Sequence, residues 1–320
     1  MSISFSPASL LATVFFGCSI LVNAQTALPL PGCETAPEVS KILNEKLDAN
    51  ALDKMKVPQR LALNRQVLED LIARYPREIE PYQRYLDETR SEDPDEHDAL
   101  LARMAKIAKD RPDDPLALLL AGWALRDKNT PESVRLLEAA LDKAPNFPWP
   151  HRELAAVYFS GKIADQNKVK EHLEAFFALC PASVDRRVHF LLAKDTALQP
   201  KVAVALRARL EKDTDPKRLK DYATLWGLEF RTRPPAEHDA LRAQIAQDLK
   251  RLEKLNPKGD AEWQEFLING YKQSGASKEV IDTKKDRLLR DYPQSSEAYE
   301  VVTDRWNDAH KEPPDQNDAP

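Results

Sequence analysis

Residues 131–145 read PESVRLLEAALDKAP, and this stretch carries the pattern that decides the fold. Its apolar side chains recur at the spacing of one helix face: Val134, Leu137, Ala140 and Leu141. Pro131 suits the first turn of a helix, where the backbone N–H has no helical partner. Pro145 ends the helix, because a proline biases the residue before it away from the helical region. The stretch therefore predicts one amphipathic helix bounded by two prolines.

The same boundary recurs along most of the chain. Seven prolines each follow an amphipathic stretch: Pro76, Pro112, Pro145, Pro181, Pro216, Pro257 and Pro293. The steps between them are 36, 33, 36, 35, 41 and 36 residues, and the string EHDAL at 96–100 returns at 237–241. Such a period indicates a repeat architecture, and two helices fit in each period. No stretch alternates apolar and polar residues as a strand does, so we expect an all-α chain.

The composition excludes several classes of enzyme. The 320 residues include 8 glycines and 24 prolines, the reverse of the usual ranking. Phosphate-binding loops need glycines, and neither the dinucleotide nor the P-loop motif occurs, so the sequence argues against a nucleotide-binding α/β enzyme. The net charge of −5 gives no basic stripe for nucleic acid. The six histidines lack metal-ligand spacing, and we expect no enzymatic activity, no cofactor and no metal.

The repeat unit resembles the tetratricopeptide repeat, in which large and small apolar residues alternate on two helices and a proline closes the unit. The matching residues are Leu154-Ala155 with Tyr158 and Gly161, Leu267 with Tyr271 and Gly275, and Ala140-Leu141 before Pro145. The resemblance covers residues 58–308. It implies an α-solenoid of about seven helix-turn-helix units. A helical bundle without superhelical stacking is the alternative.

The resemblance also implies a function. Tetratricopeptide proteins bind a peptide or a protein partner in the concave groove of the solenoid, so we expect a non-catalytic scaffold. The family pattern assigns five residues to groove-facing positions: Arg152, Arg187, Tyr222, Asn269 and Lys272. A second resemblance is to the helical-repeat regions that precede thioredoxin-like domains in some exported bacterial proteins. The alternative function is therefore the interaction arm of a thiol–disulfide enzyme whose catalytic domain, with its C-x-x-C motif, is absent from this chain.

The first residues predict export. Residues 1–24 contain no charged side chain, and Ala8 to Val22 is a 15-residue apolar run, short for a membrane span but suited to a signal peptide. Val22-Asn23-Ala24 predicts cleavage before Gln25 and a periplasmic or extracellular protein. An uncleaved anchor and a lipidated Cys18 are the alternatives. The mature chain then divides into a lead and extra helix at 25–57, the repeats at 58–309 and a disordered tail at 310–320.

Five further side chains carry expectations of their own. Cys33 and Cys180 are 147 residues apart, and because distant repeats of a solenoid do not touch, we expect two unpaired thiols. A disulfide that ties the lead to the repeats is the alternative. Among the tryptophans, Trp149 stands between two prolines and is expected to be the most exposed. The last helix, 295–309, is expected to cap the array, with Tyr299 and Trp306 packed on the last repeat.

Overall fold

The computed structural model describes residues 29–47, 55–159, 163–193 and 195–310, and every regular element in these ranges is a helix. Most helices follow one another in pairs: α1 (Pro37–Lys46) and α3 (Val57–Arg74), α4 (Ile79–Glu92) and α5 (Pro94–Asp110), α6 (Pro115–Leu125) and α7 (Thr130–Lys143), α8 (Pro148–Phe159) and α9 (Gln166–Leu179), α10 (Arg186–Leu192) and α11 (Gln199–Leu210), α13 (Tyr222–Thr232) and α14 (His238–Leu255), and α15 (Ala261–Gln273) and α16 (Lys278–Asp291). The short helices α12 (Pro216–Leu219) and η1 (Pro235–Glu237) and the final α17 (Ser296–Ala309) complete the order. The predicted signal peptide, Cys18 and residues 311–320 of the predicted tail lie outside the described ranges.

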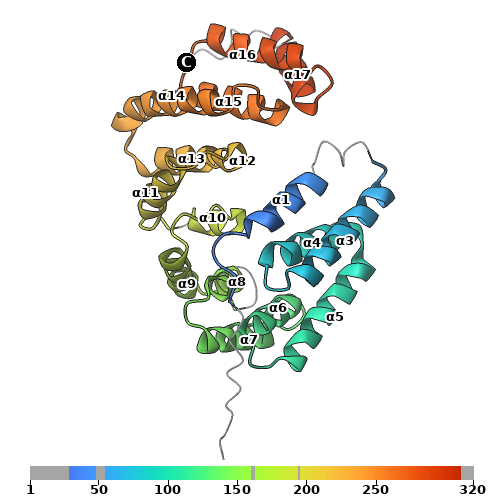
Figure 1. Cartoon of the computed structure of the whole chain (residues 1–320). Helices are drawn as coiled ribbons and strands as arrows, with labels where there is room; N and C mark the ends of the chain where they lie inside the picture. Colours follow the sequence, from blue (N-terminus) through green and yellow to red (C-terminus); the bar gives the residue numbers. More distant parts are fainter. Residues whose placement is uncertain (1–28, 48–54, 160–162, 194, 311–320) are drawn as a thin grey trace, which may run out of the picture.

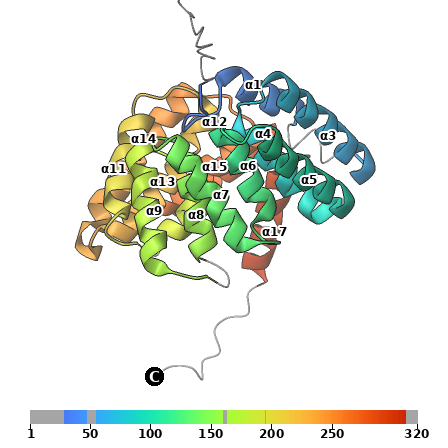
Figure 2. The same ribbon diagram turned by 90° about the horizontal axis from the view of Figure 1, so that it is seen from below.

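The pairs follow one another along a curved path (Figure 1). Seen from below, the path bends from α3 through α7 and α8 to α11 and α14 (Figure 2). The helices contact mainly the helices next to them in the sequence, such as α6 with α7 and α8 with α9. The all-α prediction is therefore confirmed for the described residues, and contacts between neighbours dominate the packing.

The prolines end the second helices, as their spacing predicts. Six of the seven lie two residues beyond the end of α3, α5, α7, α9, α14 or α16. The residue between helix and proline leaves the helical region; Ala144, for example, has φ −146° and ψ 82°. Pro216 is the exception, because it lies farther from the end of α11 and opens α12. The longer spacing around Pro216 and Pro257 accommodates the extra short helices α12 and η1.

Several helix starts carry polar caps. Side chains of Asp93, Asp114, Asn129 and Asp260 each accept a hydrogen bond from a backbone N–H in the first turn of the following helix. Prolines at the first or second position of α3, α5, α6, α7 and α11 also favour helix starts. Local side chains thus mark the beginning of α5, α6, α7 and α15.

Close packing within a pair depends on small residues. Gly122 of α6 faces α7, and a Cβ at this position would lie 2.8 Å from Leu137 Cδ2. The Ser133 hydroxyl donates a hydrogen bond to the Gly122 carbonyl at 2.7 Å, and Ser133 is fully buried. α6 itself is apolar on almost every face, and most of its residues are buried. The two helices can therefore approach until backbone and side chain are in contact.

One expectation about the ends needs correction. Within the predicted lead and extra helix, α1 spans Pro37–Lys46, and residues 48–54 lie outside the described ranges. Tyr299 and Trp306 do not pack on the preceding pair, since they are 73% and 61% exposed. Ala298 and Val301 are the buried residues of α17, which places the aromatic residues on the opposite side of this helix.

Candidate functional site

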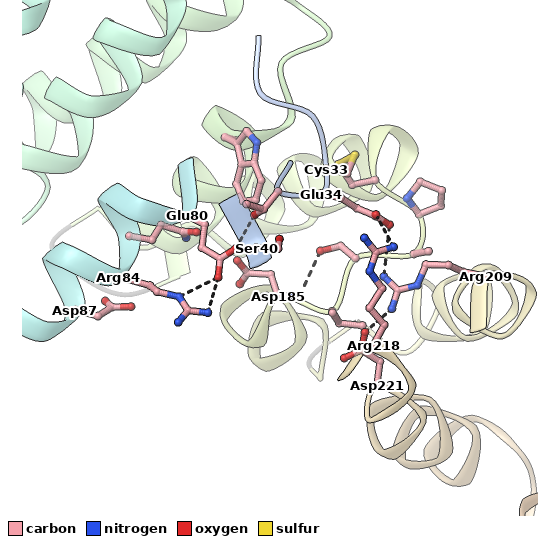
Figure 3. A pocket seen from close by; sticks show the side chains of 18 residues that line it. Cys33, Glu34, Ser40, Glu80, Arg84, Asp87, Asp185, Arg209, Arg218 and Asp221 are labelled. Atoms are coloured by element: carbon pink, nitrogen blue, oxygen red, sulfur yellow. Dashed lines mark hydrogen bonds and ion pairs between the residues drawn. A yellow bond between two sulfur atoms is a disulfide. The ribbon is translucent and has the colours of Figure 1, made fainter. Parts of the chain in front are cut away.

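A pocket lies where the N-terminal segment crosses the helix pairs. Its volume is about 710 Å³. We use the name lead for residues 29–36, which precede α1 without forming a helix. The walls of the pocket are the lead, α1, the start of α4, the turn between α9 and α10, and residues of α8, α11, α12 and the position before α13 (Figure 3). Segments far apart in the sequence therefore meet at this pocket, which we call the central pocket.

The lead is held in a non-helical form by hydrogen bonds to residues of two helix pairs, α4 with α5 and α8 with α9. The indole Nε1 of Trp149, at the start of α8, donates to the carbonyl of Gly32 at 2.9 Å. The hydroxyl of Thr35 donates to the Glu80 carboxylate of α4 at 2.6 Å. The Ala36 N–H donates to the carboxylate of Glu78, the residue before α4, at 3.2 Å. These bonds use both the backbone and the side chains of the lead.

A disulfide fixes the lead to the end of α9. Cys33 and Cys180 are bonded, with 5.5 Å between their Cα atoms, which is an ordinary separation for a disulfide. The expectation of two unpaired thiols is therefore wrong for this structure. It assumed that residues 147 apart belong to repeats that do not touch. The lead is not part of a repeat, and it runs across the pairs instead of stacking on its neighbour.

Next to the disulfide, two arginines receive a carboxylate from the lead. Glu34 Oε2 lies 3.2 Å from an Nη1 of Arg218, and Glu34 Oε1 lies 3.9 Å from Nη1 of Arg209 (Figure 3). Arg209 also pairs with Asp221 at 2.5 Å, which fixes its guanidinium from the other side. Burial raises the pKa of Asp221, and the attraction of Arg209 offsets only part of this rise. The two arginines thus bind different oxygens of one carboxylate.

Behind the central pocket lies a buried arginine. Arg152 of α8 is 1% exposed and pairs with Glu153 at 2.5 Å and with Asp185 at 2.6 Å. Its guanidinium carbon lies 4.7 Å from the ring centre of Trp149 and 5.4 Å from that of Trp123. Burial lowers the pKa of Arg152, but the attraction of the two carboxylates outweighs burial and the net shift is upward. This network supports the pocket wall from within.

The network corrects two predictions. Arg152 is not on a groove surface, because the two tryptophans and the ion pairs enclose it on all sides. Trp149 is not the exposed tryptophan, since it is 9% exposed and contacts both Arg152 and the lead. Trp149 and Arg152 are three residues apart and lie on the same side of α8. The lead contacts this side of the helix at Trp149. The sequence carries no sign of that contact, because the lead is more than 100 residues away.

The other predicted groove residues do not form one site. Tyr222 is fully buried, because its ring packs on Trp226, with ring centres 5.6 Å apart. Arg187 belongs to α10, and its side chain lies outside the described part of the structure. Asn269 and Lys272 are exposed on α15, where Lys272 lies 3.8 Å from Asp304. Tyr222, Asn269 and Lys272 do not line the central pocket.

Two histidines that are separate in the sequence meet in the structure. The Nδ1 atoms of His151 and His172 lie 3.1 Å apart, and the ring of Tyr158 stacks on His172. Burial and the charge of His151 lower the pKa of His172 to about 4. α8 and α9 bring the two rings together, and their separation of 21 residues has no recognised ligand spacing. Within the described residues no group of three or more metal-binding side chains is placed to hold a metal ion.

Several charged side chains that line the pocket pair with one another, such as Arg209 with Asp221 and Arg84 with Glu80. No family model matches the sequence, and no curated protein matches it. In the ranges that the structure describes, every helix is too short or too polar to cross a membrane.

Proposed function

We propose that this chain is an exported, non-catalytic scaffold of the tetratricopeptide type that binds an extended segment of a partner protein at the central pocket. The main observation behind this proposal is that the pocket already accommodates a non-helical segment, the lead. Gly32 is bound through its carbonyl, Thr35 through its hydroxyl and Glu34 through its carboxylate. Backbone recognition of this kind is tolerant of sequence, and the charged contacts add selectivity.

The finer parts of the proposal have their own support. The proline spacing and the dominance of contacts between neighbouring helices favour a solenoid of about seven units over a bundle. The Cys33–Cys180 disulfide favours an oxidising compartment, since disulfides rarely persist in a reducing cytosol. The apolar run of residues 8–22 supports the same location.

Photo-crosslinking from the pocket tests the proposal. A photoreactive side chain replaces Ala182, which lines the central pocket in the turn after α9, and the full mature chain is incubated with an envelope extract. The matched control carries the same group at Lys250, which is exposed on α14 and does not line the pocket. We expect one major partner from Ala182 and none from Lys250. The absence of a specific product from Ala182, with and without a reductant, would contradict the proposed function.

A further inference from the structure

The lead is held by three partly buried hydrogen bonds, two ion pairs and one covalent bond. The Glu34 side chain is 52% exposed although it pairs with two arginines, and of residues 29–36 only Pro31 is buried. Exposed ion pairs contribute little, and a non-helical segment loses conformational entropy when it is ordered. The covalent bond to Cys180 is therefore the strongest single contact that keeps Glu34 beside the arginines.

The two arginines that receive Glu34 also have ion-pair partners outside the lead. Arg209 is the last but one residue of α11, its side chain is 19% exposed, and Asp221 holds it at 2.5 Å. Arg218 belongs to α12 and also lies 3.8 Å from Asp213. Glu34, which comes from a distant part of the chain, pairs with both arginines. If the lead moved away, the two guanidinium groups would remain in position for another carboxylate.

We propose that the lead is a releasable clasp: the Cys33–Cys180 disulfide keeps Glu34 between Arg209 and Arg218, and opening the disulfide frees this site for an acidic, extended segment of a partner. The inference rests on the proposed function and names its partner class and its regulation. The occupant is a peptide with a carboxylate side chain, because the site binds both oxygens of one. The lead itself is the template for such a peptide.

A dithiol opens the clasp by thiol–disulfide exchange. Its thiolate attacks the sulfur of Cys33, the exposed half of the bond, while Cys180 is 1% exposed. The Cys33–Cys180 bond breaks, and the sulfur of Cys180 leaves as a thiolate that takes up a proton. The second thiol of the dithiol then attacks the mixed disulfide and releases Cys33 as a thiol. Two electrons pass to the protein, and the dithiol becomes a disulfide.

Proteolysis measures the release of the lead. A glutamate-specific protease cleaves after Glu34 in the full chain, and the products are separated under reducing conditions. We expect cleavage after Glu34 to be about tenfold faster in Cys33→Ser and in the reduced wild type than in the oxidised wild type. The reason is that a segment must detach from the folded chain before it can enter the active site of the protease. Equal rates in the oxidised and reduced chains would overturn the clasp.

A peptide titration tests the freed site. The probe is the peptide of residues 29–38 carrying Cys33→Ser, and binding is followed by NMR of arginine side chains. The receiving chain is the full-length Cys33→Ser/Glu34→Ala variant, so that its own lead competes poorly. We expect this chain to bind the probe and the oxidised wild type to bind it about tenfold more weakly, since the tethered Glu34 occupies the site. Binding should weaken by about the same factor for a Glu34→Gln probe.

Two charge reversals locate the site. Arg218→Glu in the receiving chain should abolish binding, whereas Arg242→Glu, in an exposed arginine paired with Asp239, should leave it unchanged. No binding by the freed chain, equal binding by the oxidised chain, or equal binding of the glutamine probe would each overturn the inference. Failure of the proposed function is distinguishable from these results. A partner crosslinked from Ala182 in both redox states overturns the clasp alone, and no crosslinked partner in either state overturns the scaffold.

Discussion

Removing the Cys33–Cys180 disulfide should lower the stability of the folded chain substantially. Cys33→Ser is the suitable change, because Cys33 is exposed whereas a serine at Cys180 would place a hydroxyl in the core. The bond closes a loop of 147 residues in the unfolded chain. Chain-entropy arguments give a contribution of about 5 kcal/mol for a loop of that size. In the folded variant the freed lead gains conformational entropy, which offsets part of this contribution. We therefore expect the free energy of unfolding to fall by about 3–5 kcal/mol.

Urea unfolding provides the assay. Far-UV circular dichroism follows the helices and tryptophan fluorescence follows the wall around Trp149, both without added thiol. The midpoint should shift to lower urea in Cys33→Ser, and the wild type in a reductant should unfold like the variant in the same reductant. A free energy of unfolding for Cys33→Ser within about 1 kcal/mol of that of the oxidised wild type would refute the reasoning, because closing a loop of this length should stabilise the chain by more than that. Peptide mapping without reduction checks that the wild type carries the bond.

Three further changes test the packing and the buried charges. His172→Gln should make the stability of the folded chain less sensitive to acid. The pKa of His172 is lowered to about 4 in the folded chain, whereas it is near 6.5 in the unfolded chain. The neutral ring of His172 therefore contributes its full stability above pH 6.5, and this contribution is lost as the pH falls from about 6.5 to 4. Urea midpoints over this pH range should show a loss of about 2–3 kcal/mol in the wild type that shrinks in the variant. Arg152→Lys should cost about 3 kcal/mol in urea unfolding, because a lysine cannot bind both carboxylates and stack on Trp149; a neutral result would mean the site is not enclosed. Gly270→Ala should lower the melting temperature through a cost of about 1–3 kcal/mol, since its Cβ would lie 2.6 Å from a Leu249 methyl, whereas the control Gly227→Ala, with nothing nearer than 3.6 Å, should stabilise α13 by up to about 1 kcal/mol.

The parts of the fold that depend on local chemistry were predictable from the sequence. Pro145 and the prolines like it end helices because of sterics between adjacent residues, and Asn129 caps α7 from within the same turn. These effects act over four residues or fewer, so one sequence suffices to locate them. The bounds of α12 and η1 were not predicted, because the 41-residue step was treated as one longer unit.

The candidate site was much less predictable, because its residues meet through tertiary contacts. Arg152 was placed on the correct helix, but its enclosure depends on Trp123 of another helix and on Asp185 after α9. Glu34 and Arg218 are brought together by the path of the lead across the pairs, which no periodicity describes. Tyr299 shows the same limit, since helical spacing identifies two faces of α17 without saying which one meets the preceding pair.

The disulfide also divides the molecule mechanically. Where helices contact mainly their neighbours in the sequence, small rotations at each interface add up along the chain. The bond between Cys33 and Cys180 closes the part from α1 to α9 into a covalent ring, which limits how far this part can lengthen under tension. The helices from α10 onward lie outside this ring. A stretching force is therefore expected to lengthen the part from α10 to α17 more than the part from α1 to α9.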